Sequence, residues 1–301
     1  MSIKVQHITK LYGKQKALNN VSFEVNSGEV VGFLGPNGAG KSTMMKILTC
    51  FLPQTSGTAS VYGFDVSEQS LEVRKNVGYL PESNPLYYDM YVKEYLSFVA
   101  ALHKLKNNAQ RVKEIIFITG LEVEQKKKIG ALSKGYKQRV GLAQALIHDP
   151  KVLIMDEPTS GLDPIQLTEI RGVIKEIGKA KTVMLSTHIM QEVEAMCDRV
   201  IIISKGNIVA DKPTQELKKS FSNQAIVTVE FDKAASLSAL SNISGVQDVK
   251  NISGNTWQIT SSSSEDIRTD IFNFAVQNQL IVLTVQKEEQ KLEDIFKELA
   301  G

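Results

Sequence analysis

A continuous run of residues from Gly35 to Thr43 has the types and the order of a loop that holds phosphate groups. The run consists of Gly35, Pro36, Asn37, Gly38, Ala39, Gly40, Lys41, Ser42 and Thr43. Its glycines let the backbone turn tightly around an anion, and the helix expected after it adds a positive N-terminal end. The Lys41 ammonium can reach the terminal phosphates, and the Ser42 hydroxyl can ligate Mg²⁺. The run therefore predicts a nucleoside triphosphate site.

Two adjacent carboxylates, Asp156 and Glu157, follow the apolar segment KVLIM. Alone, such a pair would indicate only a solvated strand end. After a phosphate loop, Asp156 is expected to hold the Mg²⁺ shell through water, and Glu157 is expected to polarise the water that attacks the γ-phosphate. The two motifs together predict hydrolysis of the phosphoanhydride bond to the γ-phosphate.

The elements that must position these motifs are buried strands. The apolar runs VVGFLG, KVLIMD, TVMLST and RVIIIS alternate with helical patterns, which predicts an α/β fold with a parallel core sheet. Residues 1–26 alternate apolar with polar side chains, which predicts an antiparallel β flank. Helical spacing between Tyr91 and Leu121 predicts a helical subdomain, which we place at about residues 84–148.

The residue composition of the sequence changes near residue 221, where we place a domain boundary. After it, the order strand, helix, strand, strand, helix, strand predicts a small α+β, ferredoxin-like domain over residues 222–301. A last helix is expected over KLEDIFKELA. The chain then consists of a larger domain, 1–221, and an accessory C-terminal domain.

Length and composition exclude several classes of protein. A chain of 301 residues fits about two domains, and two cysteines without a signal-peptide segment indicate a reducing cytosol. The longest apolar runs, Val152–Met155 and Val200–Ile203, are far shorter than the roughly 18 residues of a membrane-spanning helix. A net charge of +2 gives no reason to expect nucleic acid as a partner.

Two segments flank the carboxylate pair: LSKGYKQR begins at Leu132, and SGLD occupies Ser160–Asp163. With them, residues 1 to about 220 resemble the ATP-binding cassette (ABC) family. In that family ATP lies between the phosphate loop of one subunit and the LSGGQ-type signature of another, so the resemblance implies a homodimer or a paired cassette. It also implies that Ser133 and Gly135 face the γ-phosphate across the interface, and it assigns Asp163 to the nucleotide site.

The resemblance gives roles to three further residues. Tyr12 matches the aromatic residue that stacks on adenine, and His188 matches the switch histidine that senses the γ-phosphate. Without this context, Tyr12 would be interpreted as a tyrosine that packs against its neighbours, and His188 as a solvated residue that caps the end of a strand. Glu82, in GYLPE, stands where the family normally has the Q-loop glutamine; it can approach Mg²⁺ but cannot donate a hydrogen bond when ionised. The signature also departs from the family pattern, at Lys134 and Tyr136.

Within the family, the segment PESNPLYYDMYVKEYL and the appended domain are similar to ATPase subunits of ABC-2-type exporters. Among these, the chain is similar to the ATP-binding subunit associated with gliding motility in Bacteroidetes. This resemblance implies an ATPase that uses ATP and Mg²⁺. It also implies a cytoplasmic protein that is peripheral on the inner face of the cell membrane and drives integral membrane permease subunits.

Two other classes share part of this pattern. A soluble ABC ATPase acting on ribosomes or DNA has the same motifs, but the translation-factor type resembles two cassettes in one chain. The repair type places long coiled coils between the segments that correspond to Lys41 and Ser133. A small-molecule P-loop kinase would lack LSKGY and SGLD, both of which are present here.

Overall fold

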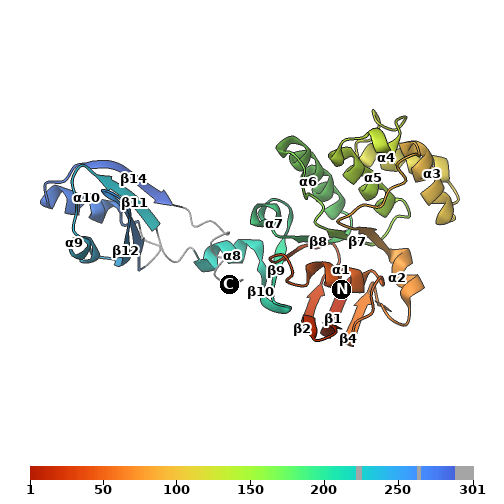
Figure 1. Cartoon of the computed structure of the whole chain (residues 1–301), viewed down its shortest axis with the longest axis horizontal. Coiled ribbons are helices and arrows are strands. Elements are labelled where there is room, and N and C mark those ends of the chain that lie inside the picture. Colours follow the sequence, from red (N-terminus) through yellow and green to blue (C-terminus); the bar gives the residue numbers. More distant parts are fainter. Residues whose placement is uncertain (222–225, 263–265, 289–301) are drawn as a thin grey trace. The chain divides into compact units, whose positions relative to one another are not determined.

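The computed structural model describes residues 1–221, 226–262 and 266–288 (Figure 1). The chain forms two compact units, and the division falls between Thr214 and Gln215. Each unit has its own cluster of buried apolar side chains. The boundary expected near residue 221 is seven residues further along the chain, at the end of helix α8 (Thr214–Phe221), most of which belongs to the second unit.

The first unit is built on a six-stranded sheet in the order β10-β9-β3-β8-β7-β6. Its strands are β3 (Val30–Leu34), β6 (Val77–Leu80), β7 (Val152–Asp156), β8 (Thr182–Thr187), β9 (Arg199–Ser204) and β10 (Asn207–Pro213). Strands β6, β7, β8, β3 and β9 are parallel, and every residue of β3, β7 and β8 is buried, as expected for strands covered on both faces. The predicted α/β fold with a parallel core sheet is confirmed. The antiparallel edge strand β10 follows a tight turn at Lys205 and Gly206, which both have positive φ.

A second, antiparallel sheet in the order β2-β1-β4-β5 forms the predicted β flank. Its strands are β1 (Ile3–Tyr12), β2 (Gln15–Val25), β4 (Ser56–Val61) and β5 (Phe64–Asp65). Helix α1 (Lys41–Leu48) contacts strands of both sheets. Met44, Met45 and Ile47 on this helix are fully buried, and each such side chain stabilises the fold by about 1.5–3 kcal/mol. Packing of α1 therefore fixes the helix that follows the phosphate loop.

The remaining elements of the first unit are helical (Figure 1). They are α2 (Ser70–Asn76), α3 (Val92–Leu102), α4 (Asn108–Ile118), η1 (Ile129–Ala131), α5 (Lys134–Leu146), α6 (Pro164–Gly178) and α7 (Met190–Met196). Helices α3 and α4 occupy the stretch where helical spacing was predicted, and they bury Tyr95, Val99 and Ile115. Within the described part of the chain, no helix has the length and apolar character needed to cross a bilayer.

The second unit has the predicted ferredoxin-like order. Its elements are β11 (Ile226–Phe231), α9 (Leu237–Ser241), β12 (Val246–Ser253), β13 (Thr256–Ser261), α10 (Arg268–Gln277) and β14 (Val282–Glu288). The sheet order is β12-β13-β11-β14 with every neighbouring pair antiparallel, and Val227, Val229 and Phe231 alternate into the core. The helix expected over KLEDIFKELA lies outside the described residues.

A pair of stacked histidines joins the helical region to the core sheet. The rings of His103, after α3, and His148, after α5, are nearly parallel with centroids 4.2 Å apart. His148 Nε2 donates a hydrogen bond of 3.0 Å to the carbonyl of Val77, the first residue of β6. Burial, and then the neighbouring His103, lower the pKa of His148 to about 4. The folded chain therefore favours the neutral form of His148.

We expect the free energy of unfolding to fall between pH 7 and pH 5, because the unfolded chain binds a proton at His148 that the folded chain does not. With an unfolded pKa near 6.5 and a folded pKa of about 4, the loss begins as the pH falls through 6.5 and reaches roughly 2 kcal/mol at pH 5. Urea unfolding at both pH values should show that His148→Gln removes this loss. The exposed His7→Gln variant is the control, and an unchanged pH dependence in His148→Gln would contradict the prediction.

Candidate nucleotide-binding site

The phosphate loop joins the end of β3 to the start of α1, and its glycines are required by its shape. Gly38 and Gly40 have φ values of 80° and 110°, and a Cβ atom on Gly40 would lie 2.5 Å from the carbonyl oxygen of Ala17. Among the described residues, no side chain caps the first turn of α1. Its N–H groups can therefore bind an anion.

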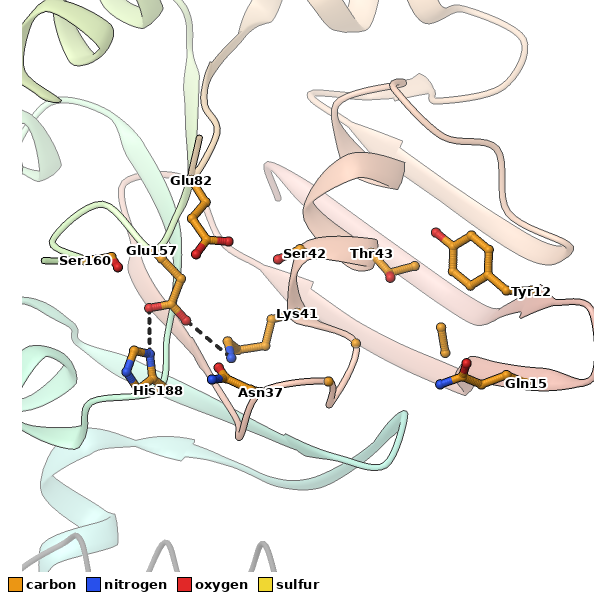
Figure 2. A pocket seen from close by; sticks show the side chains of 13 residues that line it. Tyr12, Gln15, Asn37, Lys41, Ser42, Thr43, Glu82, Glu157, Ser160 and His188 are labelled. Atoms are coloured by element: carbon orange, nitrogen blue, oxygen red, sulfur yellow. Dashed lines mark hydrogen bonds and ion pairs between the residues drawn. The ribbon is translucent and has the colours of Figure 1, made fainter. Parts of the chain in front are cut away.

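A pocket of about 540 Å³ opens around this loop (Figure 2). Its lining consists of Tyr12, Gln15, Ala17, Asn37, Gly38, Gly40, Lys41, Ser42, Thr43, Glu82, Glu157, Ser160 and His188. In Figure 2, Tyr12 and Gln15 lie on one side of α1, and Glu82, Glu157 and His188 lie on the other. The structure thus gathers the predicted residues of the β flank, the phosphate loop and the strand ends around one cavity.

Glu157 is at the centre of the charged end of the pocket. Its Oε1 lies 3.3 Å from Lys41 Nζ, and its Oε2 lies 2.9 Å from His188 Nδ1. Lys41 Nζ also donates a hydrogen bond of 2.7 Å to the carbonyl of Gly35. The Lys41 and Glu157 side chains are only 6% and 8% exposed, so their attraction is weakly screened. A carboxylate, an ammonium and an imidazole therefore meet at one end of the pocket.

The backbone of Glu157 is held in a left-handed conformation, with φ of 49°. For a residue other than glycine this conformation costs about 1–2 kcal/mol. The Glu157 N–H donates to the carbonyl and to the hydroxyl of Ser186 at 3.2 Å and 3.0 Å, respectively. These two hydrogen bonds offset the strain, and they fix the direction in which the Glu157 side chain points from the end of β7.

The oxygen atoms beside Lys41 fit a Mg²⁺ ion. Ser42 Oγ donates to Asp156 Oδ1 at 3.1 Å, and Ser186 Oγ donates to the same oxygen at 2.5 Å. Asp156 is 2% exposed and does not itself line the pocket, whereas Ser42 and Glu82 do. Hydroxyl and carboxylate oxygens are the ligands that Mg²⁺ prefers, usually together with several waters and substrate phosphates.

The signature residues lie at the start of α5, outside the pocket of their own chain. Ser133 is the N-cap of α5, and its Oγ accepts hydrogen bonds of 3.4 Å from the Tyr136 N–H and from Gln166 Nε2. A Cβ atom on Gly135 would lie 2.6 Å from the Gln166 side chain. A larger residue at this position would therefore displace the Gln166 side chain.

Asp163 has a clear local contact in this chain. It is the N-cap of α6, and its Oδ1 accepts hydrogen bonds from the N–H groups of Ile165 and Gln166 at 3.0 Å and 2.9 Å. Lys134, which stands at a glycine position of the family signature, extends its ammonium over Gly161 of the SGLD loop. Asp163 does not line the pocket, so its role at a nucleotide stays a prediction.

Three lining residues were not predicted: Gln15, Ala17 and Ser160. Gln15 and Ala17 follow the turn at Gly13 and lie on β2, close to Tyr12. A hairpin prediction around Gly13 would have found them. Conversely, Gly35, Pro36 and Ala39 of the predicted loop do not line the pocket; a Cβ atom on Gly35 would lie 2.4 Å from the carbonyl oxygen of Ile203.

Comparisons with known proteins agree with this site. A family model described as ABC transporter matches residues 18–160, and a model of the C-terminal domain of DrrA1-3-like ATP-binding proteins matches residues 213–300. The bacitracin transport ATP-binding protein BcrA of Bacillus licheniformis is 33% identical over 99% of this chain and 97% of that protein. The linearmycin resistance ATP-binding protein LnrL of Bacillus subtilis is 32% identical over 99% and 98%.

A solved structure shows the same fold. The cassette MJ0796, described as a dimer in a post-hydrolysis state bound to ADP and Pi, has a TM-score of 0.65 at 26% identity and covers 70% of this chain and 98% of that chain. The fold and the site define a P-loop ATPase. The chain belongs to the ABC transporter family, as one of its ATP-binding, ATP-hydrolysing subunits. The family and fold predicted from the sequence motifs are confirmed.

Proposed function

We propose that this ATPase powers an ABC-2-type exporter from the cytoplasmic face of the cell membrane, where it binds separate integral membrane permease subunits. The observation that carries the proposal is the similarity to BcrA and LnrL over nearly the whole chain, including the C-terminal domain. Those proteins are named for bacitracin transport and linearmycin resistance. The match of residues 213–300 to the DrrA1-3-like domain supports the same subgroup.

In this proposal ATP lies along the pocket from Tyr12 to His188. The half-exposed Tyr12 ring stacks on adenine, and the loop N–H groups and Lys41 bind the phosphates. Ser42, Asp156 and Glu82 would hold Mg²⁺, which neutralises charge on the phosphates when it is bound. Each of these roles uses a group that lines the pocket or contacts one that does.

Hydrolysis in this proposal depends on Glu157 and His188. Glu157 orients and polarises the attacking water, and His188 holds the γ-phosphate in place. Ser133, Gly135 and Asp163 lie outside the pocket of their own chain, so a second copy would supply them to complete the site. The N-terminus of α5, capped by Ser133, would then direct its N–H groups at the γ-phosphate. We therefore propose a homodimer as the working unit.

An exposed aromatic surface suits the permease contact. Its four residues are Tyr87, Tyr88, Tyr91 and Phe98, which are 40–56% exposed. The Tyr87 ring contacts the Phe98 ring with centroids 5.9 Å apart, so these two rings form one exposed apolar group. The segment that carries it begins just after Glu82, which lines the nucleotide pocket. Exposed apolar side chains grouped in this way are typical of a protein contact.

We expect the tagged full-length chain, purified from its native membranes in detergent, to bring down a multi-span membrane protein. The double variant Tyr88→Ser, Phe98→Ser should reduce its recovery at least about tenfold, because loss of aromatic anchors from an interface is costly. ATP affinity should not change, since neither residue lines the pocket. The control is Phe51→Ser, which removes an aromatic ring that is 76% exposed elsewhere. Recovery of no multi-span protein with the wild-type chain would contradict the proposal.

The alternative of a soluble ABC ATPase acting on ribosomes or DNA has less support. The helices between Lys41 and Ser133 are all short, and the longest of them are α3 and α4. This segment therefore does not form the long coiled coil of repair-type proteins. The closer likeness to gliding-motility subunits remains a prediction from the sequence. The relatives described above carry the names of antibiotic transport and resistance instead.

A further inference from the structure

A buried carboxylate, Glu192 on α7, lies outside the pocket and has no solvent exposure. Its Oε1 accepts a hydrogen bond from the Thr159 hydroxyl, and its Oε2 accepts one of 2.5 Å from the Thr187 hydroxyl. Burial of a carboxylate is costly unless hydrogen bonds compensate for the lost water. The two hydroxyls supply that compensation, and one comes from the loop after β7 and the other from the end of β8.

Thr159 connects Glu192 to the loop that carries Glu157. Thr159 is 3% exposed, and the loop around it is tight, because the Ser160 N–H donates to the Glu157 carbonyl and the Leu162 N–H donates to the Thr159 carbonyl. Few torsions therefore separate the Thr159 hydroxyl from the Glu157 backbone. Fixing the hydroxyl on Glu192 limits the movement of Glu157.

Thr187 connects Glu192 to His188. Thr187 is the last residue of β8, and its hydroxyl accepts a hydrogen bond of 3.1 Å from the Ile189 N–H while it donates to Glu192. The Ile189 N–H can only donate to this hydroxyl, which leaves the hydroxyl's own proton for Glu192. The side chain of the residue before His188 thus binds the N–H of the residue after it, and this bridge fixes the backbone from which the imidazole ring projects.

We propose that Glu192 is a positioning residue that keeps Glu157 and His188 in contact. These two residues are far apart in sequence, and their 2.9 Å hydrogen bond requires that two separate loops keep a fixed distance. One carboxylate that binds a hydroxyl in the Glu157 loop and a hydroxyl directly before His188 sets this distance. The inference rests on the proposed function, in which Glu157 and His188 act together at the γ-phosphate.

The test compares Glu192→Ala and Thr187→Val with the wild-type full-length chain. Both variants should lower kcat by about 10-fold to 10²-fold, the effect of a catalytic group displaced by about 1 Å. ATP affinity should stay within about threefold, because the phosphate loop and Lys41 keep their contacts. This separation of kcat from binding is not expected of a general loss of stability.

The matched control is Thr182→Val, at the other end of β8. The Thr182 hydroxyl is also buried, with a hydrogen bond of 2.8 Å to Ser2 Oγ and one of 3.0 Å from the Gly28 N–H. Its loss should destabilise the fold to a similar extent as the loss of the hydroxyl in Thr187→Val, because both remove a buried hydrogen-bonding group. The kcat of Thr182→Val should nevertheless stay at the wild-type value.

A second measurement does not depend on hydrolysis. The chain has four histidines, so ¹⁵N NMR can follow the His188 imidazole after assignment with His188→Ala. Its ring-nitrogen shifts should change in Glu192→Ala and Thr187→Val and stay unchanged in Thr182→Val. If the wild-type chain does not hydrolyse ATP, the proposed function fails, and these shifts still test the positioning role.

The inference is overturned if Glu192→Ala and Thr187→Val keep the wild-type kcat or the wild-type His188 shifts. It is equally overturned if Thr182→Val slows hydrolysis as much as Thr187→Val does.

Discussion

Replacement of Glu157 by Gln should give a protein that binds ATP and dimerises but hydrolyses ATP at least about 10²-fold more slowly, the usual contribution of a general base. The amide has nearly the shape of the carboxylate, and its oxygen can still accept the hydrogen bond of the His188 ring. It cannot take up a proton from water, and it carries no charge for Lys41. The chemical step should therefore fail while binding survives.

Phosphate release measures the turnover, and size-exclusion chromatography with ATP measures dimerisation. The control is Glu72→Gln on α2, which also neutralises a carboxylate that pairs with a lysine, Lys75, but at the surface. It should keep the wild-type turnover, because exposed ion pairs contribute only about 0–1 kcal/mol. Near wild-type turnover in Glu157→Gln would remove Glu157 from the role of base.

Replacement of Lys41 by Ala should weaken ATP binding by about 30-fold to 150-fold, because a charge-assisted hydrogen bond in a buried site contributes roughly 2–3 kcal/mol. The fold should also lose stability, since Glu157 then keeps a buried charge with only His188 beside it. Titration with a fluorescent ATP analogue, at a temperature where circular dichroism shows the variant to be folded, measures the affinity.

The control for this variant lies on the same helix. Lys46→Ala removes an identical side chain from the last turn of α1, away from the pocket, and should leave the affinity for ATP unchanged. If Lys41→Ala binds ATP as tightly as the wild-type chain, the loop does not hold the phosphates in the way proposed here.

Four strands of the core sheet, β3, β7, β8 and β9, could be predicted because they are buried and therefore appear as continuous apolar runs. Strand β6 and the exposed edge strand β10 were not predicted. Strand β4 was missed, because Ser56–Val61 is mostly small and polar and half of it is exposed. Its strand conformation comes from pairing with β1, whose residues lie far away in sequence. The local sequence pattern of Ser56–Val61 does not show this pairing with β1.

The phosphate-binding residues could be predicted because the chemistry requires fixed types at fixed spacing. The contact between Glu157 and His188 is different, since it depends on β7 and β8 being neighbours in the sheet. The role proposed for Glu192 depends on the same adjacency. A buried glutamate in the middle of MQEVEAM has no sequence signal that separates it from an exposed one.

The left-handed backbone at Glu157 lowers the stability of the fold at the position whose side chain we propose to act in hydrolysis. Glycine adopts φ of 49° without strain, so a chain selected only for a stable turn would have glycine there. The carboxylate is kept in spite of that cost, as is common where function and stability make opposite demands. Attempts to make this ATPase more heat-resistant by relaxing strained residues should therefore not change this turn. Glycine in place of Glu157 would raise stability, but in the proposed function it would remove the carboxylate that hydrolysis needs.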